Sequence, residues 1–313
     1  YDITSRVLCR LEKVLQTEKP DYVLVHGDTT TTFTAALAAF YQQIKVAHVE
    51  AGLRTGNLAS PFPEEANRRL TGVLADLNFA PTETAKNNLI RENKKKENIF
   101  VVGNTVIDAL LSTVKENYRF ADKEIEEIEA HKRVILVTTH RRENLGTPMH
   151  HVYKALRRLV ETVPHTEVVF PVHRNPLVRE AVEEELEGVP GIHLVEPMEY
   201  EPFTNLMARS SIVLTDSGGI QEEAPSLGKP VLVLRDTTER PEAIEAGTVK
   251  LVGTDENLIY ETAYRLLTDK KAYDAMSEAV NPYGDGKASE RIVETLLYRS
   301  GLSDKKPSKF IAK

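Results

Sequence analysis

Three acidic residues of this sequence stand where strands of a parallel sheet would end. Asp28 follows the apolar run 22–25, Glu50 follows the largely apolar run 46–49, and Glu64 follows Pro63 at the start of a charged helical segment. Ligands of open α/β sheets bind outside the carboxyl ends of the strands. Carboxylates at such positions can give and take protons. The pattern therefore predicts an acid/base site formed by Asp28, Glu50 and Glu64.

Structural interpretations compete with this one for two of the acids. An aspartate before a helix is a favoured N-cap, which would explain Asp28. An acid in the first turn of a helix, after a proline, is common, which would explain Glu64. Each alternative alone is about as common as a functional role. Three acids at neighbouring strand ends, together with the phosphate site described next, favour function.

A glycine pair follows another apolar run. Residues 214–223 (LTDSGGIQEE) predict a strand, a turn through Ser217, Gly218 and Gly219, and the start of a helix. Backbone N–H groups at such a turn attract phosphate, and glycine allows close approach. A simple helix cap needs fewer glycines, so a phosphate site is favoured. Neither G-x-G-x-x-G nor a Walker motif occurs, which argues against dinucleotide and P-loop triphosphate binding.

A cationic cluster follows the apolar run 134–139. His140, Arg141 and Arg142 suit a pyrophosphate oxygen or a leaving phosphate. Solvated arginine is the alternative for Arg142, and a packed histidine is the alternative for His140. The segment His48-Val49-Glu50 resembles half of a zinc deaminase signature, but the P-C-x-x-C half is missing. No metal site is predicted.

Composition narrows the class of protein. With 313 residues, 41% hydrophobic and 28% charged, the chain predicts two globular domains of about 100 to 150 residues each. No long apolar run or export leader is present, so we expect a soluble, cytoplasmic protein without membrane segments. The net charge of −7 argues against nucleic acid as a partner. The single cysteine, Cys9, excludes an internal disulfide framework.

Apolar runs alternate with helical segments, which is typical of parallel sheets built from βαβ units. The fold class predicted is α/β, with two doubly wound, Rossmann-like domains. Strands are expected near residues 22–25, 45–49, 76–80, 99–102, 133–138, 166–171, 192–195, 211–215, 231–234 and 249–252. Helices are expected near residues 5–16, 30–42, 63–74, 82–92, 104–115 and 288–298.

The expected domains follow from these elements. Residues 1–117 form a partial N-terminal Rossmann-like domain with the three acids, and 118–132 form a charged linker. Residues 133–286 form a complete C-terminal Rossmann-like domain. Residues 287–302 form a helix that packs back on the first domain, and 303–313 form a loose tail. Because the first half opens on a helix, its sheet is expected to lack strands on the N-terminal side.

Six segments together resemble one family, the bacterial non-hydrolysing UDP-N-acetylglucosamine 2-epimerases. They are residues 26–32 (HGDTTTT), 48–55 (HVEAGLRT), 63–68 (PEEANR), 140–143 (HRRE), 216–225 (DSGGIQEEAP) and 235–242 (RDTTERPE). The resemblance implies the glycosyltransferase-B fold, with a cleft between two domains. The family's opening strand and G-T-R-P-E-A-I-K loop have no counterpart here, a difference of about 60 residues or roughly two βα units.

The resemblance also implies a reaction. It is the reversible conversion of UDP-N-acetylglucosamine to UDP-N-acetylmannosamine, by elimination of UDP to 2-acetamidoglucal and re-addition, without a cofactor. Partners would be UDP-N-acetylglucosamine, UDP and a second copy in a homodimer, and the product would enter cell-wall or capsule polysaccharide. Alternatives are a hydrolysing epimerase or a glycosyltransferase of the same fold, or an inactive nucleotide-sugar-binding regulator.

Matching the motifs residue by residue implies roles. The catalytic residues would be Asp28, Glu50, Glu64 and His140. The UDP site would use Ser217, Gly218 and Gly219 for the diphosphate, Glu223 for the ribose, Phe203 beside the uracil, and Arg142. For Phe203 a core aromatic is the alternative. Arg141 and His173 match positions linked to activation by a second substrate molecule.

Overall fold

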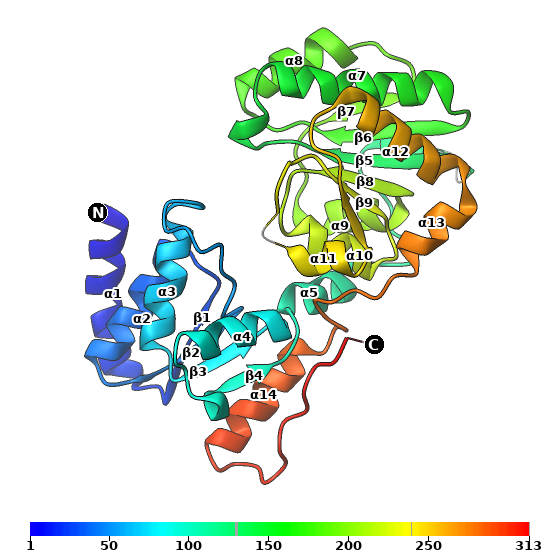
Figure 1. Cartoon of the computed structure of the whole chain (residues 1–313). Coiled ribbons are helices and arrows are strands. Elements are labelled where there is room, and N and C mark those ends of the chain that lie inside the picture. The colour runs from blue at the N-terminus through cyan, green and yellow to red at the C-terminus, as the bar shows by residue number, and fades with distance from the viewer. Residues whose placement is uncertain (129–130, 239, 313) are drawn as a thin grey trace. The chain divides into compact units, whose positions relative to one another are not determined.

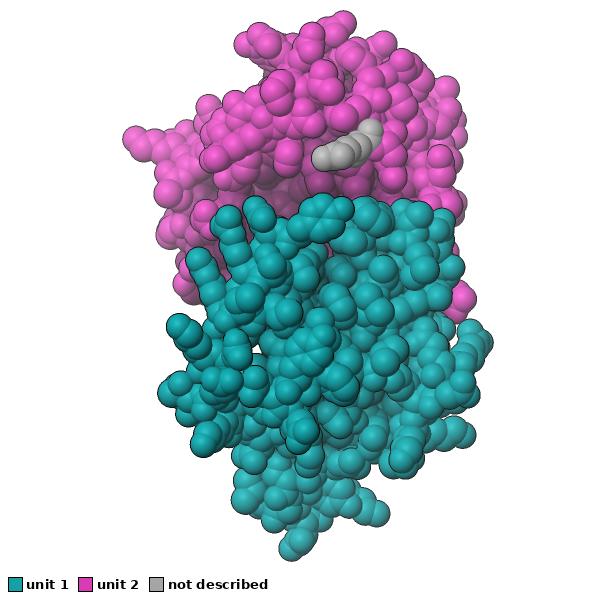
Figure 2. Space-filling model, turned by 90° about the vertical axis from the view of Figure 1, so that its left-hand side faces the viewer, with its two compact units in different colours: residues 1–108, 283–312 teal, residues 109–282, 313 magenta. Residues whose placement is uncertain are grey.

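The computed structural model describes residues 1–128, 131–238 and 240–312, and the chain folds into two compact units (Figure 1). Unit 1 contains residues 1–108 and 283–312, and unit 2 contains residues 109–282 (Figure 2). The chain thus leaves unit 1 once and returns to it near the end. Helix α5 (Thr105–Thr113) contains the point at which it first leaves.

Unit 1 is built on a four-stranded parallel sheet in the order β1-β2-β3-β4. Successive residues of a strand point to opposite faces, so β2 serves two cores. Val46 packs with Leu15 and Ala36 of the first two helices, whereas Ala47 packs with Ile292 of α14. The elements are α1 (Asp2–Glu18), β1 (Tyr22–His26), α2 (Thr30–Tyr41), β2 (Lys45–Val49), α3 (Glu64–Leu74), β3 (Leu77–Ala80), α4 (Glu83–Arg91), η1 (Lys96–Asn98), β4 (Ile99–Val101) and α14 (Ala288–Arg299).

Unit 2 is built on a six-stranded parallel sheet in the order β10-β9-β8-β5-β6-β7. Its main core lies where α7, α8 and α12 pack on one face of the sheet, as Leu156 and Ile259 do against Ile135. The elements are α6 (Lys123–Glu126), β5 (Arg133–Thr138), η2 (Arg142–Asn144), α7 (Thr147–Thr162), β6 (Thr166–Pro171), α8 (Pro176–Leu186), β7 (Ile192–Val195), α9 (Tyr200–Arg209), β8 (Ile212–Thr215), α10 (Ile220–Ser226), β9 (Val231–Val233), α11 (Pro241–Glu245), β10 (Val249–Leu251), α12 (Glu256–Thr268) and α13 (Lys270–Ser277).

The predicted fold class is confirmed, and each of the ten expected strands is found within one residue of its expected ends. Helix α6 lies in the charged segment 118–132, where only a linker was expected. The last residues are not wholly loose, because Phe310 is buried and its N–H donates to Val101 O. No helix of the described chain is both long enough and apolar enough to cross a membrane.

Candidate active site

The turn after β1 is held by a buried histidine. His48 Nε2 lies 2.8 Å from Gly27 O, to which it must donate because a carbonyl oxygen only accepts. Burial lowers the pKa of His48 to about 4, so the ring is neutral and this tautomer is fixed. Gly27 has φ +70°, and a Cβ added there would lie 3.4 Å from Glu50 Oε2. The ends of β1 and β2 therefore meet at this turn.

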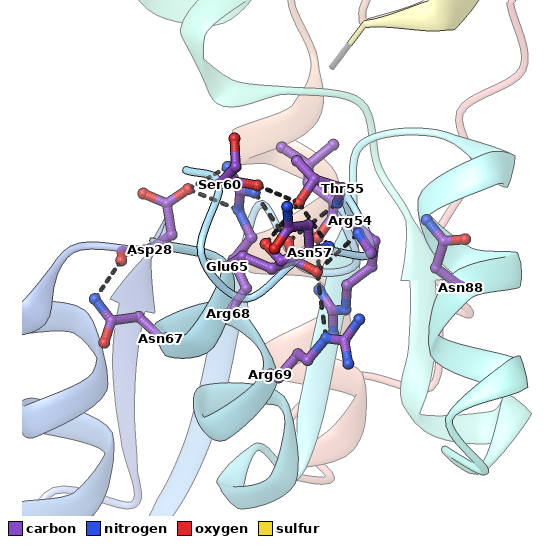
Figure 3. Close-up of polar contacts among 12 residues, drawn as sticks. Asp28, Arg54, Thr55, Asn57, Ser60, Glu65, Asn67, Arg68, Arg69 and Asn88 are labelled. Carbon is purple, nitrogen blue, oxygen red and sulfur yellow. Dashed lines mark hydrogen bonds and ion pairs between the residues drawn. The ribbon is translucent and has the colours of Figure 1, made fainter. Parts of the chain in front are cut away.

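Asp28 is paired with α3 rather than capping a helix. Arg68 Nε and Nη2 each lie 2.8 Å from Asp28 Oδ2, and Asn67 Nδ2 donates to Asp28 O at 2.9 Å (Figure 3). The N-cap of α2 is Thr29, whose hydroxyl accepts from Thr32 N–H. The structural alternative for Asp28 is therefore wrong, and its carboxylate stays about a quarter exposed beside an arginine.

Glu65 lies at the centre of the polar contacts drawn in Figure 3, and the sequence analysis assigned no role to it. Its buried carboxylate accepts from Thr55 N–H at 3.1 Å, Gly56 N–H at 3.2 Å, Arg68 Nη1 at 3.2 Å and Arg69 Nε at 3.2 Å. Burial alone would raise the pKa of Glu65, but the backbone hydrogen bonds and Arg68 outweigh burial and lower it. Glu65 thus fastens the loop after β2 to α3 and to Arg68.

Glu50 follows β2 and faces a second histidine that sequence reasoning did not single out. Its backbone has φ +64°, a left-handed conformation that a glutamate adopts rarely. Glu50 Oε2 lies 3.3 Å from Nε2 of His26, whose side chain is 58% exposed. The hydrogen bond with Glu50 raises the pKa of His26 against the lowering effect of burial, and the charges of Glu50 and Asp28 add to the increase.

Glu64 is the first residue of α3 and makes no hydrogen bond or ion pair within the part of the chain that the structure describes. Arg68 comes one helical turn later, so Glu64 and Arg68 project from the same side of α3. Arg68 contacts Asp28, and Glu50 lies beside Gly27, next to Asp28. Unit 1 therefore brings Asp28, Glu50 and Glu64 to one end of its sheet, as expected for the carboxyl ends of parallel strands.

Replacing Glu65 with glutamine should make the acid stability of the protein less dependent on pH. Because folding lowers the pKa of Glu65, its ionisation stabilises the fold above its unfolded pKa, and this contribution is lost as pH falls through the folded pKa. The variant should have a lower Tm at pH 7. The difference from wild type should shrink on acidification below about pH 4.5. Calorimetric Tm values between pH 7 and pH 3 test this, and a difference independent of pH would contradict it.

In unit 2 a buried aspartate, Asp216, connects the end of β8 to the residues that follow β5. Asp216 Oδ2 accepts from the N–H groups of His140 and Arg141, at 2.9 Å each, and from Asn144 Nδ2 at 3.3 Å. His140 Nδ1 lies 2.9 Å from Asp216 Oδ1. Burial would raise the pKa of Asp216, but the contacts with His140 and the N–H of Arg141 lower it overall. The His140 side chain, 40% exposed, is thus held by a partner that the sequence analysis had not assigned.

The glycine turn follows β8 directly after Asp216. Ser217 N–H donates to Thr215 Oγ1 at 3.0 Å, and Ser217 O accepts from Gln221 Nε2 at 3.2 Å. The Ser217 hydroxyl has no partner among the residues that the structure describes, and Gly219 is exposed. Both can therefore face a ligand.

The other residues assigned to phosphate binding and activation lie around His140. The His173 ring stacks on the His140 ring, with centroids 6.0 Å apart and planes at 29°. Arg141 Nε donates to Asp216 O at 3.3 Å. The side chain of Arg142 lies outside the described part of the structure. Unit 2 thus brings Arg141, His140 and His173 together.

Glu223 lies on α10 and is nearly buried, with 7% of its surface exposed. Tyr200 OH donates to Glu223 Oε1 at 2.8 Å. Burial raises the pKa of Glu223, and this hydrogen bond offsets the increase only in part. Phe203, half-buried, follows Tyr200 by three residues on α9. The sequence analysis assigned no role to Tyr200, although its position one helical turn before Phe203 indicates that the two side chains lie on the same side of α9.

Among the described residues, one group of side chains has the spacing of metal ligands. His150, Glu184 and Glu185 place ligand atoms within 4.8 Å of one another, on α7 and α8. Lys154 Nζ lies 3.7 Å from Glu185 Oε1, so a lysine competes with any cation for this carboxylate. We assign no ion to it.

Two parallel-sheet units, each with chemistry-bearing side chains at its strand ends, define a two-domain α/β protein of the glycosyltransferase-B type. The family model for UDP-N-acetylglucosamine 2-epimerase matches residues 1–297. The chain belongs to the UDP-N-acetylglucosamine 2-epimerase family.

Individual relatives agree with this assignment. UDP-N-acetylglucosamine 2-epimerase of Bacillus subtilis is 58% identical over 312 residues, which cover 100% of this chain and 81% of the relative. The Neisseria meningitidis enzyme, solved bound to UDP-GlcNAc, is 53% identical with a TM-score of 0.85, over 94% of this chain and 81% of that one. The enzyme of Methanocaldococcus jannaschii is 38% identical with a TM-score of 0.81, over 94% of this chain and 82% of that one.

Proposed function

We propose that this protein interconverts UDP-N-acetylglucosamine and UDP-N-acetylmannosamine as a non-hydrolysing isomerase. The family and the UDP-GlcNAc bound in the Neisseria meningitidis relative support the substrate. The observation that carries the proposal is the cluster of three acids in unit 1, which differ in their surroundings. Asp28 is paired with Arg68, Glu50 with His26, and Glu64 has no partner among the described residues.

The chemistry of C2 requires such a cluster. The hydrogen on C2 has no adjacent carbonyl, so its removal alone would leave an unstabilised carbanion. Elimination avoids this: a base takes the C2 proton, the C–H electrons form a C1–C2 double bond, and the C1–O bond breaks to release UDP. The intermediate is 2-acetamidoglucal. UDP then adds back to C1 while an acid protonates C2 from the opposite face.

The three acids suit different parts of this reaction. The carboxylate of Asp28, which is bonded to Arg68, can stabilise the positive charge that develops at C1. Glu64 has no hydrogen bond or ion pair among the residues that the structure describes, and it can exchange a proton directly with C2. Glu50 can exchange a proton with C2 on the opposite face of the sugar. The exposed His26 beside it connects Glu50 to solvent. No step changes the oxidation state overall, so the reaction needs no nicotinamide.

We assign UDP to unit 2. The Ser217 hydroxyl and Gly219 are accessible at the turn after β8, and the nearby His140 can donate to a departing phosphate. Glu223 can accept from ribose hydroxyls, and Phe203 can lie beside uracil. Arg142, Gly218, a regulatory role of Arg141 and His173, and a homodimer rest on the family resemblance.

Proton NMR in heavy water tests the proposal. Full-length protein incubated with UDP-N-acetylglucosamine should yield both epimers with deuterium at C2, because the proton lost is replaced from solvent. Accumulation of free UDP with N-acetylmannosamine would indicate a hydrolysing enzyme. A requirement for an acceptor sugar would indicate a glycosyltransferase. Binding without exchange would indicate a regulator.

A further inference from the structure

Tyr200 makes a contact that no catalytic step above uses. It is the first residue of α9, the residue is 43% exposed, and its hydroxyl donates to the nearly buried Glu223 on α10. A buried carboxylate is costly without hydrogen-bond donors, and within the described chain Tyr200 is the donor to Glu223. The contact therefore decides where the Glu223 carboxylate points.

The two oxygens of Glu223 have different surroundings. Oε1 is held by Tyr200 at 2.8 Å. Oε2 lies on the side of the glycine turn, since a Cβ added to Gly219 would lie 3.8 Å from it. Oε2 has no partner among the residues that the structure describes. It is thus presented as an acceptor towards the turn that we assign to the diphosphate.

The Tyr200 oxygen, which lies 2.8 Å from Oε1 of the same carboxylate, is a second acceptor. A phenol that donates its proton keeps lone pairs that can accept. Two neighbouring acceptors match two neighbouring hydroxyl donors, which is what a ribose offers at its 2′ and 3′ positions. A 2′-deoxyribose has only one of these hydroxyls and would leave one of the two acceptors without a partner. Sites of this kind discriminate strongly against the analogue that lacks the hydroxyl.

We propose that Tyr200 is a positioning residue that aligns Glu223 to select ribonucleoside over 2′-deoxyribonucleoside diphosphates. The inference rests on the proposed assignment of UDP to unit 2. Beyond that assignment, the inference names ribose as the sugar that the site selects and Tyr200 as the residue responsible.

Calorimetric titration with UDP and with 2′-deoxy-UDP tests the proposal in wild type and in Tyr200→Phe. The variant should bind UDP on the order of 10-fold more weakly, with 2′-deoxy-UDP changed less than about twofold. In turnover, KM should rise while kcat stays within about twofold, because Tyr200 does not touch the reacting atoms. Adding Tyr200→Phe to Glu223→Gln should cost little more UDP affinity than Glu223→Gln alone.

The matched control is Tyr260→Phe, which removes a hydroxyl bonded to Thr162 on the α7 side of unit 2. It should change neither affinity. Equal losses for both nucleotides in Tyr200→Phe would mean that the residue only packs α9 and would overturn the proposal, as would no loss at all. If the wild-type protein bound neither nucleotide, the assignment of UDP itself would fail, and this inference with it.

Discussion

Glu64→Gln is expected to lower turnover about 10³-fold while the protein stays folded. Glutamine has nearly the same size but cannot take or give the C2 proton. Because Glu64 makes no hydrogen bond or ion pair within the described chain, its replacement breaks no polar contact there. The position at the start of α3 tolerates an amide at a cost of a few tenths of a kcal/mol. The NMR exchange assay measures the rate, and thermal melting checks the fold.

The reaction itself supplies a sharper test of Glu64. If Glu64 serves one face of C2, the variant should still eliminate UDP from one epimer and accumulate 2-acetamidoglucal, but not from the other. Glu290→Gln is the matched control, an exposed acid in the first turn of α14 in the same unit. It should keep full activity. Wild-type turnover in Glu64→Gln, or equal loss in both variants, would remove Glu64 from the mechanism.

The strands and the candidate acids could be predicted because their signals are local. Apolar β-branched runs of four to six residues identify buried parallel strands, and the chemistry of an open α/β sheet lies where they end. Asp28 and Glu50 follow such runs directly, and Glu64 follows a proline at a helix start. The glycine pair after β8 is local in the same way.

The partners of these acids could not be predicted, because each depends on tertiary packing. Arg68 reaches Asp28 across 40 residues of sequence, and His140 meets Asp216 across more than 70. Nothing in the local sequence distinguishes Glu65, whose buried carboxylate accepts four hydrogen bonds, from the neighbouring Glu64, whose carboxylate accepts none from the residues that the structure describes. Only the packing of α3 against the loop after β2 and the turn after β1 separates a structural carboxylate from a candidate catalytic one.

The same packing makes Arg68 the residue whose loss should damage both fold and activity. In Arg68→Met the methionine keeps part of the apolar volume but removes the two guanidinium donors to the Asp28 carboxylate and one donor to buried Glu65. Breaking a buried pair from one side costs about 3–5 kcal/mol, because a charge is left without its partner. Displacement of Asp28 should lower turnover by about 10²-fold in the fraction that is folded. Urea unfolding and the NMR assay measure the two effects.

A second substitution separates the effect on stability from the effect on activity. Adding Asp28→Asn to Arg68→Met removes one unpaired charge, so the double variant should regain part of the lost stability, yet no activity. Arg69→Met is the control, since Arg69 contacts the same Glu65 but is 42% exposed, and it should cost less than about 1 kcal/mol. If the double variant were no more stable than Arg68→Met, the loss would lie in packing, and the ion pair with Asp28 would not be what holds this acid in place.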